Sequence, residues 1–93
     1  MLVEIKKHDI VTVALSSGQE VIGKFVEEAD DTITMERPLT IAFGPEGAAF
    51  QPFTMTGDSD GKVTLNKKLV IATMPAREET GKNYRQATSG IVV

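Results

Sequence analysis

The sequence predicts an all-β fold: a small, strongly bent, five-stranded antiparallel barrel, followed by a short C-terminal helix. The first observation is alternation with a period of two, which places Val11, Val13 and Leu15 on one face of a strand. The second is a Ser-Gly turn, in which Gly18 suits the positive φ of a tight turn. The third is Gly23 in mid-strand, where a residue without Cβ permits a sharp bend or a close backbone approach.

Five strands can be placed along the chain between turn-forming segments. The second strand repeats the pattern of the first, because Val21, Gly23 and Phe25 fall on one face. Pro38 has no N–H to donate to a ladder, so it marks an edge, a bulge or a bend in the third strand. The expected strands are residues 10–15, 20–27, 32–43, 48–56 and 68–74, with turns at 27–31, 44–47 and 57–61, an approach segment at 62–67 and a tail or single turn at 2–9.

A change of period after Pro75 predicts a helix over residues 76–88. Thr80 and Tyr84 recur at helical spacing, acidic residues stand in the first turn, and basic residues follow later. Gly81 lies inside this segment and costs the helix about 1 kcal/mol relative to alanine. The C-terminal segment is therefore expected to be helical in spite of one unfavourable residue.

Length and composition are those of one globular domain, residues 1–93. A chain of this size buries only about two-thirds of its unfolded surface, so self-association would add stability. No apolar run is long enough to span a bilayer, and the N-terminus lacks the apolar core of a secretory signal. We therefore expect a cytoplasmic protein with no membrane role. Cysteine is absent, which excludes disulfides, thiolate metal sites and cysteine nucleophiles.

Charge is unevenly distributed along the chain. The net charge is −3, which argues against a protein that coats nucleic acid with its whole surface. Residues 1–43 hold eight acids and four bases, whereas residues 62–85 hold six bases and two acids. Two interpretations stay open for the basic segment: an ordinary solvated surface neutralised in part by the acidic turn, or a phosphate-binding patch.

Candidate catalytic and metal sites are weak. Asp58, Asp60 and Gly61 have the spacing of a calcium loop, but Lys67 stands where the acidic twelfth ligand belongs, so a turn is the better interpretation. The acidic cluster at 27–31 could hold a hard cation or could simply be solvated. His8 is the single histidine, and no hydroxyl has a histidine base close in sequence. We expect no enzyme, no metal and no cofactor.

The first two strands carry a motif of a known family. The spacing LxxGxxxxGxF is followed by an acidic turn and a hydrophobic strand, and its positions are Leu15, Gly18, Gly23, Phe25 and Asp30 or Asp31. This pattern resembles the first motif of Sm-like proteins, which include the eukaryotic LSm proteins and the bacterial Hfq type. The chain is most similar to the divergent Sm-like proteins of marine cyanophages and ocean metagenomes, and the motif covers about a quarter of it.

The sequence also departs from the family. The base-contacting asparagine of the family turn is missing, and Thr32 and Thr34 stand nearest to its place. The family's Arg-Gly motif is replaced by a longer segment, GDSDGKVTLNKK. A second alignment places Tyr84–Val93 on an Hfq-type strand segment, which would make these residues a strand of the barrel instead of a helix and tail. The resemblance therefore implies fold and ring assembly more directly than it implies a base-binding pocket.

The resemblance implies a homo-oligomeric ring of about five to seven subunits that binds RNA or single-stranded DNA without catalysis. The expected subunit interface is Phe53, Met55, Leu69, Ile71 and Thr73. The expected nucleic-acid-binding residues are Thr32, Thr34, Lys62, Lys67, Lys68, Arg77, Lys82, Tyr84 and Arg85. Tyr84 has a competing interpretation, as a residue that packs the helix against the barrel. The alternative function is a structural ring or adaptor in phage assembly that binds no nucleic acid.

Overall fold

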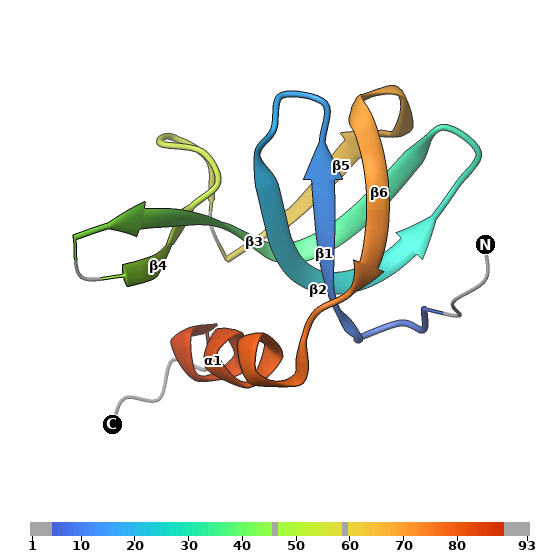
Figure 1. Ribbon diagram of the computed structural model, residues 1–93. Coiled ribbons are helices and arrows are strands. Elements are labelled where there is room, and N and C mark those ends of the chain that lie inside the picture. The colour runs from blue at the N-terminus through green and yellow to red at the C-terminus, as the bar shows by residue number, and fades with distance from the viewer. Residues whose placement is uncertain (1–4, 46, 59, 89–93) are drawn as a thin grey trace.

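The computed structural model describes residues 5–45, 47–58 and 60–88, and shows six strands followed by one helix (Figure 1). The strands are β1 (Ile10–Leu15), β2 (Glu20–Glu28), β3 (Thr32–Gly44), β4 (Gly47–Pro52), β5 (Lys62–Asn66) and β6 (Val70–Pro75). A 3₁₀ turn, η1 (Lys67–Leu69), joins the last two strands, and helix α1 (Glu78–Thr88) follows β6. The expected all-β class with a C-terminal helix is confirmed.

The sheet is antiparallel, strongly bent and open. Its strand order is β4-β3-β2-β1-β6, and β5 pairs with the other part of β3. Strand β3 pairs with β2 along one side and with two strands along the other: residues 32–36 pair with β5, and residues 39–44 pair with β4. The β3–β4 hairpin consequently projects from the rest of the sheet, with α1 beneath it (Figure 1). Strands β4, β5 and β6 each have one paired side among the described residues.

A bulge at Arg37–Pro38 divides β3 into its two parts. Lys24 pairs with Glu36 and Ile22 with the residue after Pro38, so Gly23 faces two residues of β3. Arg37 adopts a positive φ of 51°. A Cβ on Gly23 would lie 2.8 Å from the Met35 methyl carbon and 3.0 Å from the Glu36 carbonyl oxygen. The sequence predicted both a close approach at Gly23 and a bulge or bend at Pro38, and the structure contains both.

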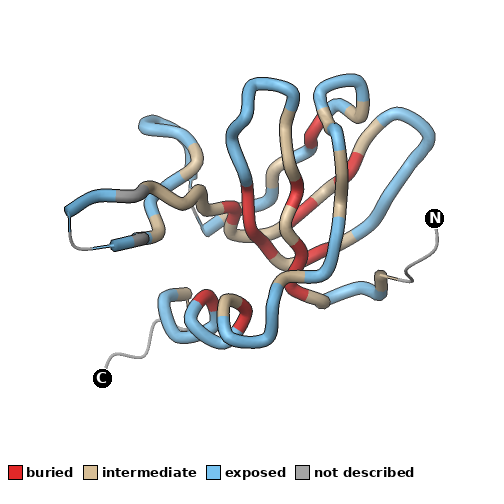
Figure 2. The backbone as a smooth tube through the Cα atoms, viewed as in Figure 1, coloured by how far each residue is buried: buried red, intermediate tan, exposed pale blue. Residues whose placement is uncertain are grey.

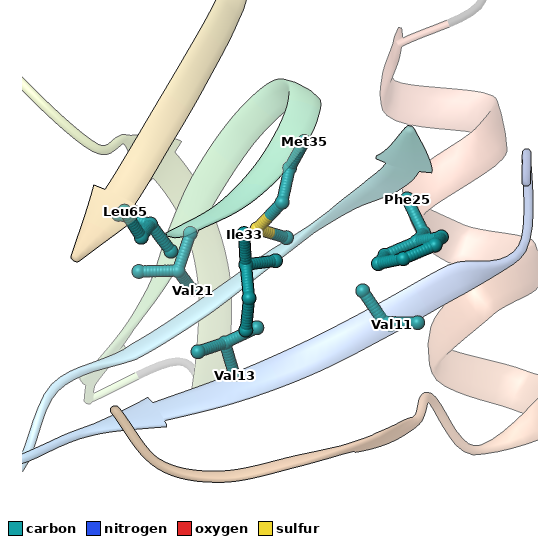
Figure 3. Packing of buried hydrophobic residues seen from close by; sticks show 7 residues of the cluster. All are labelled: Val11, Val13, Val21, Phe25, Ile33, Met35 and Leu65. Atoms are coloured by element: carbon teal, nitrogen blue, oxygen red, sulfur yellow. The ribbon is translucent and has the colours of Figure 1, made fainter. Parts of the chain in front are cut away.

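The main core lies in the hollow of the bent sheet. It consists of Val11, Val13, Val21, Phe25, Ile33, Met35 and Leu65 (Figure 3). The alternation in β1 and β2 is therefore confirmed, and Leu15 packs against the same cluster from a half-buried position. The neighbouring positions Ile10 and Ile22 point to the other face, where Tyr84 of α1 covers them. Figure 2 shows the buried positions along the central strands and on the helix.

The element boundaries differ from the prediction at several places. The expected approach segment is in fact strand β5, so the sheet has six strands instead of five. The fourth strand ends at Pro52, because proline cannot donate to the ladder, and residues 53–56 form bends. The last strand begins at Val70, after η1, and the helix begins at Glu78. Residues 84–88 belong to α1, which excludes a strand there; the remainder of the segment to Val93 lies outside the described residues.

Candidate nucleic-acid interface

The six predicted basic residues do not form one patch. The first group lies on β5 and η1: Lys67 and Lys68 stand at the start of β6, whereas Lys62 stands at the other end of β5, where it pairs with Glu36 beside the bulge. The second group is Arg77, Lys82 and Arg85, which lie just before α1 or on it. The six residues of β6 span about 20 Å, so Lys67 and Lys68 lie far from the bases on or next to α1.

In the first group, Lys67 is already occupied by contacts within the chain. Its Nζ lies 2.7 Å from a carboxylate oxygen of Glu28, and its backbone N–H donates to the Asp31 carbonyl oxygen at 2.8 Å. The Asn66 side chain accepts a hydrogen bond from the N–H of Lys68, which fixes the start of η1. These contacts indicate a structural role for Lys67, whereas Lys62 and Lys68 remain exposed.

The two predicted threonines lie beside this first group. Thr32 pairs with Asn66 and Thr34 with Thr64 across the β3–β5 ladder. The hydroxyl oxygens of Thr34 and Thr64 are 3.3 Å apart, so each hydroxyl has a neighbour within the sheet. The structure thus brings Thr32 and Thr34 together with β5 and η1, but not with the bases of α1.

The second group converges on one cleft of about 540 Å³, here called the α1 cleft. Its lining includes Asp9, Pro75, Arg77, Glu78, Lys82 and Arg85. All three basic side chains are exposed, and Lys82 and Arg85 share a helix face because they are three residues apart. Gly81 also lines the cleft and lies close to β1, since a Cβ on it would be 3.9 Å from the Ile10 Cβ atom. With three bases and two acids, the cleft has the excess positive charge that attracts a phosphate backbone.

Tyr84 does not belong to this surface. Its side chain is only 1% exposed, and its hydroxyl donates to the carbonyl oxygens of Arg37 at 2.7 Å and Glu36 at 3.2 Å. Burial raises the pKa of Tyr84 from its ordinary value of 10.0 to about 12, against the opposing effect of the nearby Arg37 charge. The prediction that Tyr84 stacks on a base is therefore wrong, and its alternative interpretation, helix packing, is confirmed.

A different aromatic residue lies near the basic group. The ring of Phe50 meets Tyr84 edge-on, with centroids 6.2 Å apart and planes at 87°. Phe50 is half-buried on β4 and lines a second cavity together with Arg77. The sequence indicated no role for Phe50 here, because nothing in the linear order indicates that β4 and α1 lie close together.

The predicted interface residues do not form one surface. Phe53 packs against the main core, and Met55 is 101% exposed but lies beyond the end of β4. Leu69 and Ile71 are 56% and 70% exposed, and Ile71 lies on β6, the strand whose outer side is unpaired. Thr73 is half-buried and pairs with β1. The apolar surface at the β6 edge is therefore present, while its expected counterpart at residues 53–55 lies outside any strand.

The weaker site candidates have structural explanations. In the 57–61 turn, the Asp58 carboxylate accepts a hydrogen bond from the Asp60 N–H at 2.9 Å, which is typical of an Asx turn. Within the described part of the chain, no group of three His, Asp or Glu side chains is placed to hold a metal ion. In the same residues, no helix is long and apolar enough to cross a membrane.

Comparison with protein-family models gave no match to this sequence, and comparison with curated proteins gave none either.

Proposed function

We propose that this chain is a non-enzymatic Sm-like protein that binds single-stranded RNA or DNA through the α1 cleft. The observation that carries the proposal is the convergence of Arg77, Lys82 and Arg85 on one cleft of an otherwise acidic chain. Charged side chains around a cleft can neutralise successive phosphates, and the release of counterions then supplies the affinity.

Sm-like membership is part of the proposal and is supported by the first hairpin. The motif residues Gly18 and Gly23 occupy positions that need glycine: Gly18 has a φ of 93°, and Gly23 lies against Met35. Ring assembly is supported by the unpaired sides of β5 and β6, which offer hydrogen-bonding groups to another copy. A ring would repeat the α1 cleft around an axis and would strengthen weak single contacts. The proposal places the protein in the cytoplasm of a cell that expresses a phage genome.

The second candidate function is a structural ring or adaptor that binds no nucleic acid. The exposed apolar side chains of Leu69 and Ile71 favour it, because they suit protein–protein contacts and not phosphate contacts. It shares the fold and the self-association of the first candidate, so the two differ in nucleic-acid binding alone.

Fluorescence anisotropy with short labelled RNA and DNA strands of equal length, measured over a range of salt concentrations, separates the two candidates. If the first candidate is correct, affinity falls steeply as the salt concentration rises. Replacing Arg77, Lys82 and Arg85 by glutamine should then reduce the slope of log K against log salt by about 2, because each phosphate contact to a single strand contributes about 0.7. The matched control removes the same charge from the other group, as Lys62→Gln, Lys67→Gln and Lys68→Gln. If the control variant loses more affinity than the α1 cleft variant, the binding site lies at β5 and η1 instead. If the parent protein binds no strand at low salt, the adaptor function is favoured.

A further inference from the structure

A second cavity of about 490 Å³ lies between the β3–β4 hairpin and α1, and is here called the Phe50 groove. Its lining includes Glu20, Ile41, Phe50, Arg77, Thr80 and Asn83. Ile41 and Phe50 are cross-strand partners, so their side chains share one face of the hairpin. Thr80 and Asn83 come from the facing helix. The groove therefore has apolar walls on the sheet side and hydrogen-bonding groups on the helix side.

Arg77 joins this groove to the α1 cleft, because it lines both cavities. If the phosphates of a strand lie along the α1 cleft, the adjoining Phe50 groove could receive a base from the same strand. Arg77 would contact the phosphate between the two. The groove is thus a continuation of the proposed binding surface, reached through a shared side chain.

The walls of the groove match the requirements of an unstacked base. An aromatic ring and an aliphatic side chain can replace the stacking that a base loses when it leaves its neighbours. Phe50 is positioned for this by its edge-on contact with the buried Tyr84. Asn83 can both donate and accept hydrogen bonds, so it can read a base edge of either polarity.

Glu20 gives the groove a preference among bases. Its backbone is fixed at the start of β2, where its carbonyl oxygen accepts a hydrogen bond from the Thr40 hydroxyl at 2.8 Å. An ionised carboxylate only accepts hydrogen bonds, and it therefore suits a base that carries an exocyclic amino group. Uracil and thymine present a single donor, N3–H, between two acceptor oxygens, O2 and O4, so one of these oxygens would meet the carboxylate unfavourably.

We propose that the Phe50 groove holds one unstacked base of a bound strand and selects adenine, cytosine or guanine over uracil and thymine. This inference depends on the proposed function, because the groove is reached by a strand already bound at the α1 cleft. It adds to that function a specific site for a base and a direction of preference.

The test compares labelled oligo(A), oligo(C) and oligo(U) of equal length, and the matching DNA strands, by anisotropy at one salt concentration. We expect oligo(A) and oligo(C) to bind about tenfold more tightly than oligo(U), which corresponds to one good base contact. Glu20→Gln should bring the three affinities to within about twofold, because an amide can donate to O4. The control is Glu79→Gln, which makes the same charge change on α1 outside both cavities. The affinities of the two variants should depend on salt concentration to the same extent.

Two further variants keep the result interpretable. Asn83→Ala, an exposed change, should weaken binding of oligo(A) and oligo(C) more than binding of oligo(U). Phe50→Leu should likewise weaken binding of oligo(A) and oligo(C) more than binding of oligo(U), provided that circular dichroism shows an unchanged fold. Two outcomes would refute the base site while leaving salt-dependent binding intact. One is equal affinity for all strands, and the other is a Glu20→Gln variant with the same base preference as Glu79→Gln. If no strand binds at low salt, the proposed function itself fails.

Discussion

Two glycines of this chain have different surroundings, so the same substitution should affect them in opposite directions. A Cβ on Gly23 would lie within 3.0 Å of both the Met35 methyl carbon and the Glu36 carbonyl oxygen, and the backbone oxygen cannot move without breaking the bulge. A Cβ on Gly81 meets only the Ile10 Cβ atom, at 3.9 Å, which is an ordinary contact. Gly81 is also inside α1, where glycine is unfavourable.

Gly23→Ala should therefore lower the free energy of unfolding by about 1–3 kcal/mol through overpacking. Gly81→Ala should raise it by about 0.5–1 kcal/mol, because alanine restricts the unfolded chain and favours the helix. Urea denaturation of both variants and of the parent protein measures these changes as shifts in the midpoint at constant slope. Two shifts of the same sign would contradict the packing described for one of the two glycines.

At the scale of elements, α1 is hydrogen-bonded to Glu36 and Arg37, which lie next to and within the β3 bulge. The Tyr84 hydroxyl donates to the carbonyl oxygens of Glu36 and Arg37, and the Arg37 guanidinium donates to the Thr88 carbonyl oxygen at 2.9 Å. The positive φ of Arg37 turns its carbonyl group out of the β3 ladder, which leaves it available to the helix. The bulge that divides β3 thus also provides the docking site for α1.

The burial of the Tyr84 hydroxyl predicts a loss of stability at high pH. The pKa of Tyr84 is about 12 in the folded chain and about 10 when it is unfolded. Between these values the unfolded chain loses the proton and the folded chain keeps it, so the free energy of unfolding is unaffected below pH 10 and falls as the pH rises toward 12. Because the chain has one tyrosine, absorbance of the phenolate reports Tyr84 directly.

The absorbance titration should therefore have its midpoint near 12, and Tyr84→Phe should show a smaller loss of stability than the parent protein between pH 10 and 12. The variant should also be less stable at neutral pH by about 1–3 kcal/mol, since two carbonyl groups lose their donor. A titration midpoint near 10 would mean that Tyr84 is exposed and that α1 is not docked as described.

The sequence carried enough information to place some elements and not others. The sequence predicted the alternation in β1 and β2, the close approach at Gly23 and the bulge or bend at Pro38, because each depends on a local requirement of the backbone. Strand β5 was missed although Val63 and Leu65 alternate, since its short, lysine-flanked sequence resembles a loop. The Phe50 groove was not predictable, because it depends on how far β3 and β4 project over α1.

At the scale of the whole molecule, the order of charges along the chain was a poor guide to which basic side chains lie together. Six bases lie close together in the sequence, but β6 separates Lys67 and Lys68 from the bases on or next to α1, and Lys62 lies at the other end of β5. Within the first group, Lys67 pairs with Glu28 of the acidic turn, so part of the late positive charge neutralises the early negative charge. Of the residues predicted from the sequence, Arg77, Lys82 and Arg85 line the α1 cleft and Tyr84 does not, and only the fold shows which of them lie together.

Self-association is the whole-molecule property on which the ring proposal depends. In the part of the chain that the structure describes, strand β6 has one side without a partner strand, and Ile71 on it is 70% exposed; Leu69 and Met74 are exposed nearby in the sequence. An apolar edge strand of this kind favours pairing with another chain, and a lysine on such an edge opposes it. We therefore expect sedimentation equilibrium to give a mass several times the 10.0 kDa of one chain, and Ile71→Lys to reduce it toward 10.0 kDa.

Met55→Lys provides the matched control, because Met55 is more exposed than Ile71 but lies outside every strand. This variant should keep the parent assembly if the contact runs along β6. If Met55→Lys dissociates the assembly and Ile71→Lys does not, the contact between subunits is formed by the segment after β4 instead. A parent protein that sediments as a 10.0 kDa particle at micromolar concentration would leave each α1 cleft to bind singly, and the proposed gain from repeated weak contacts would be lost.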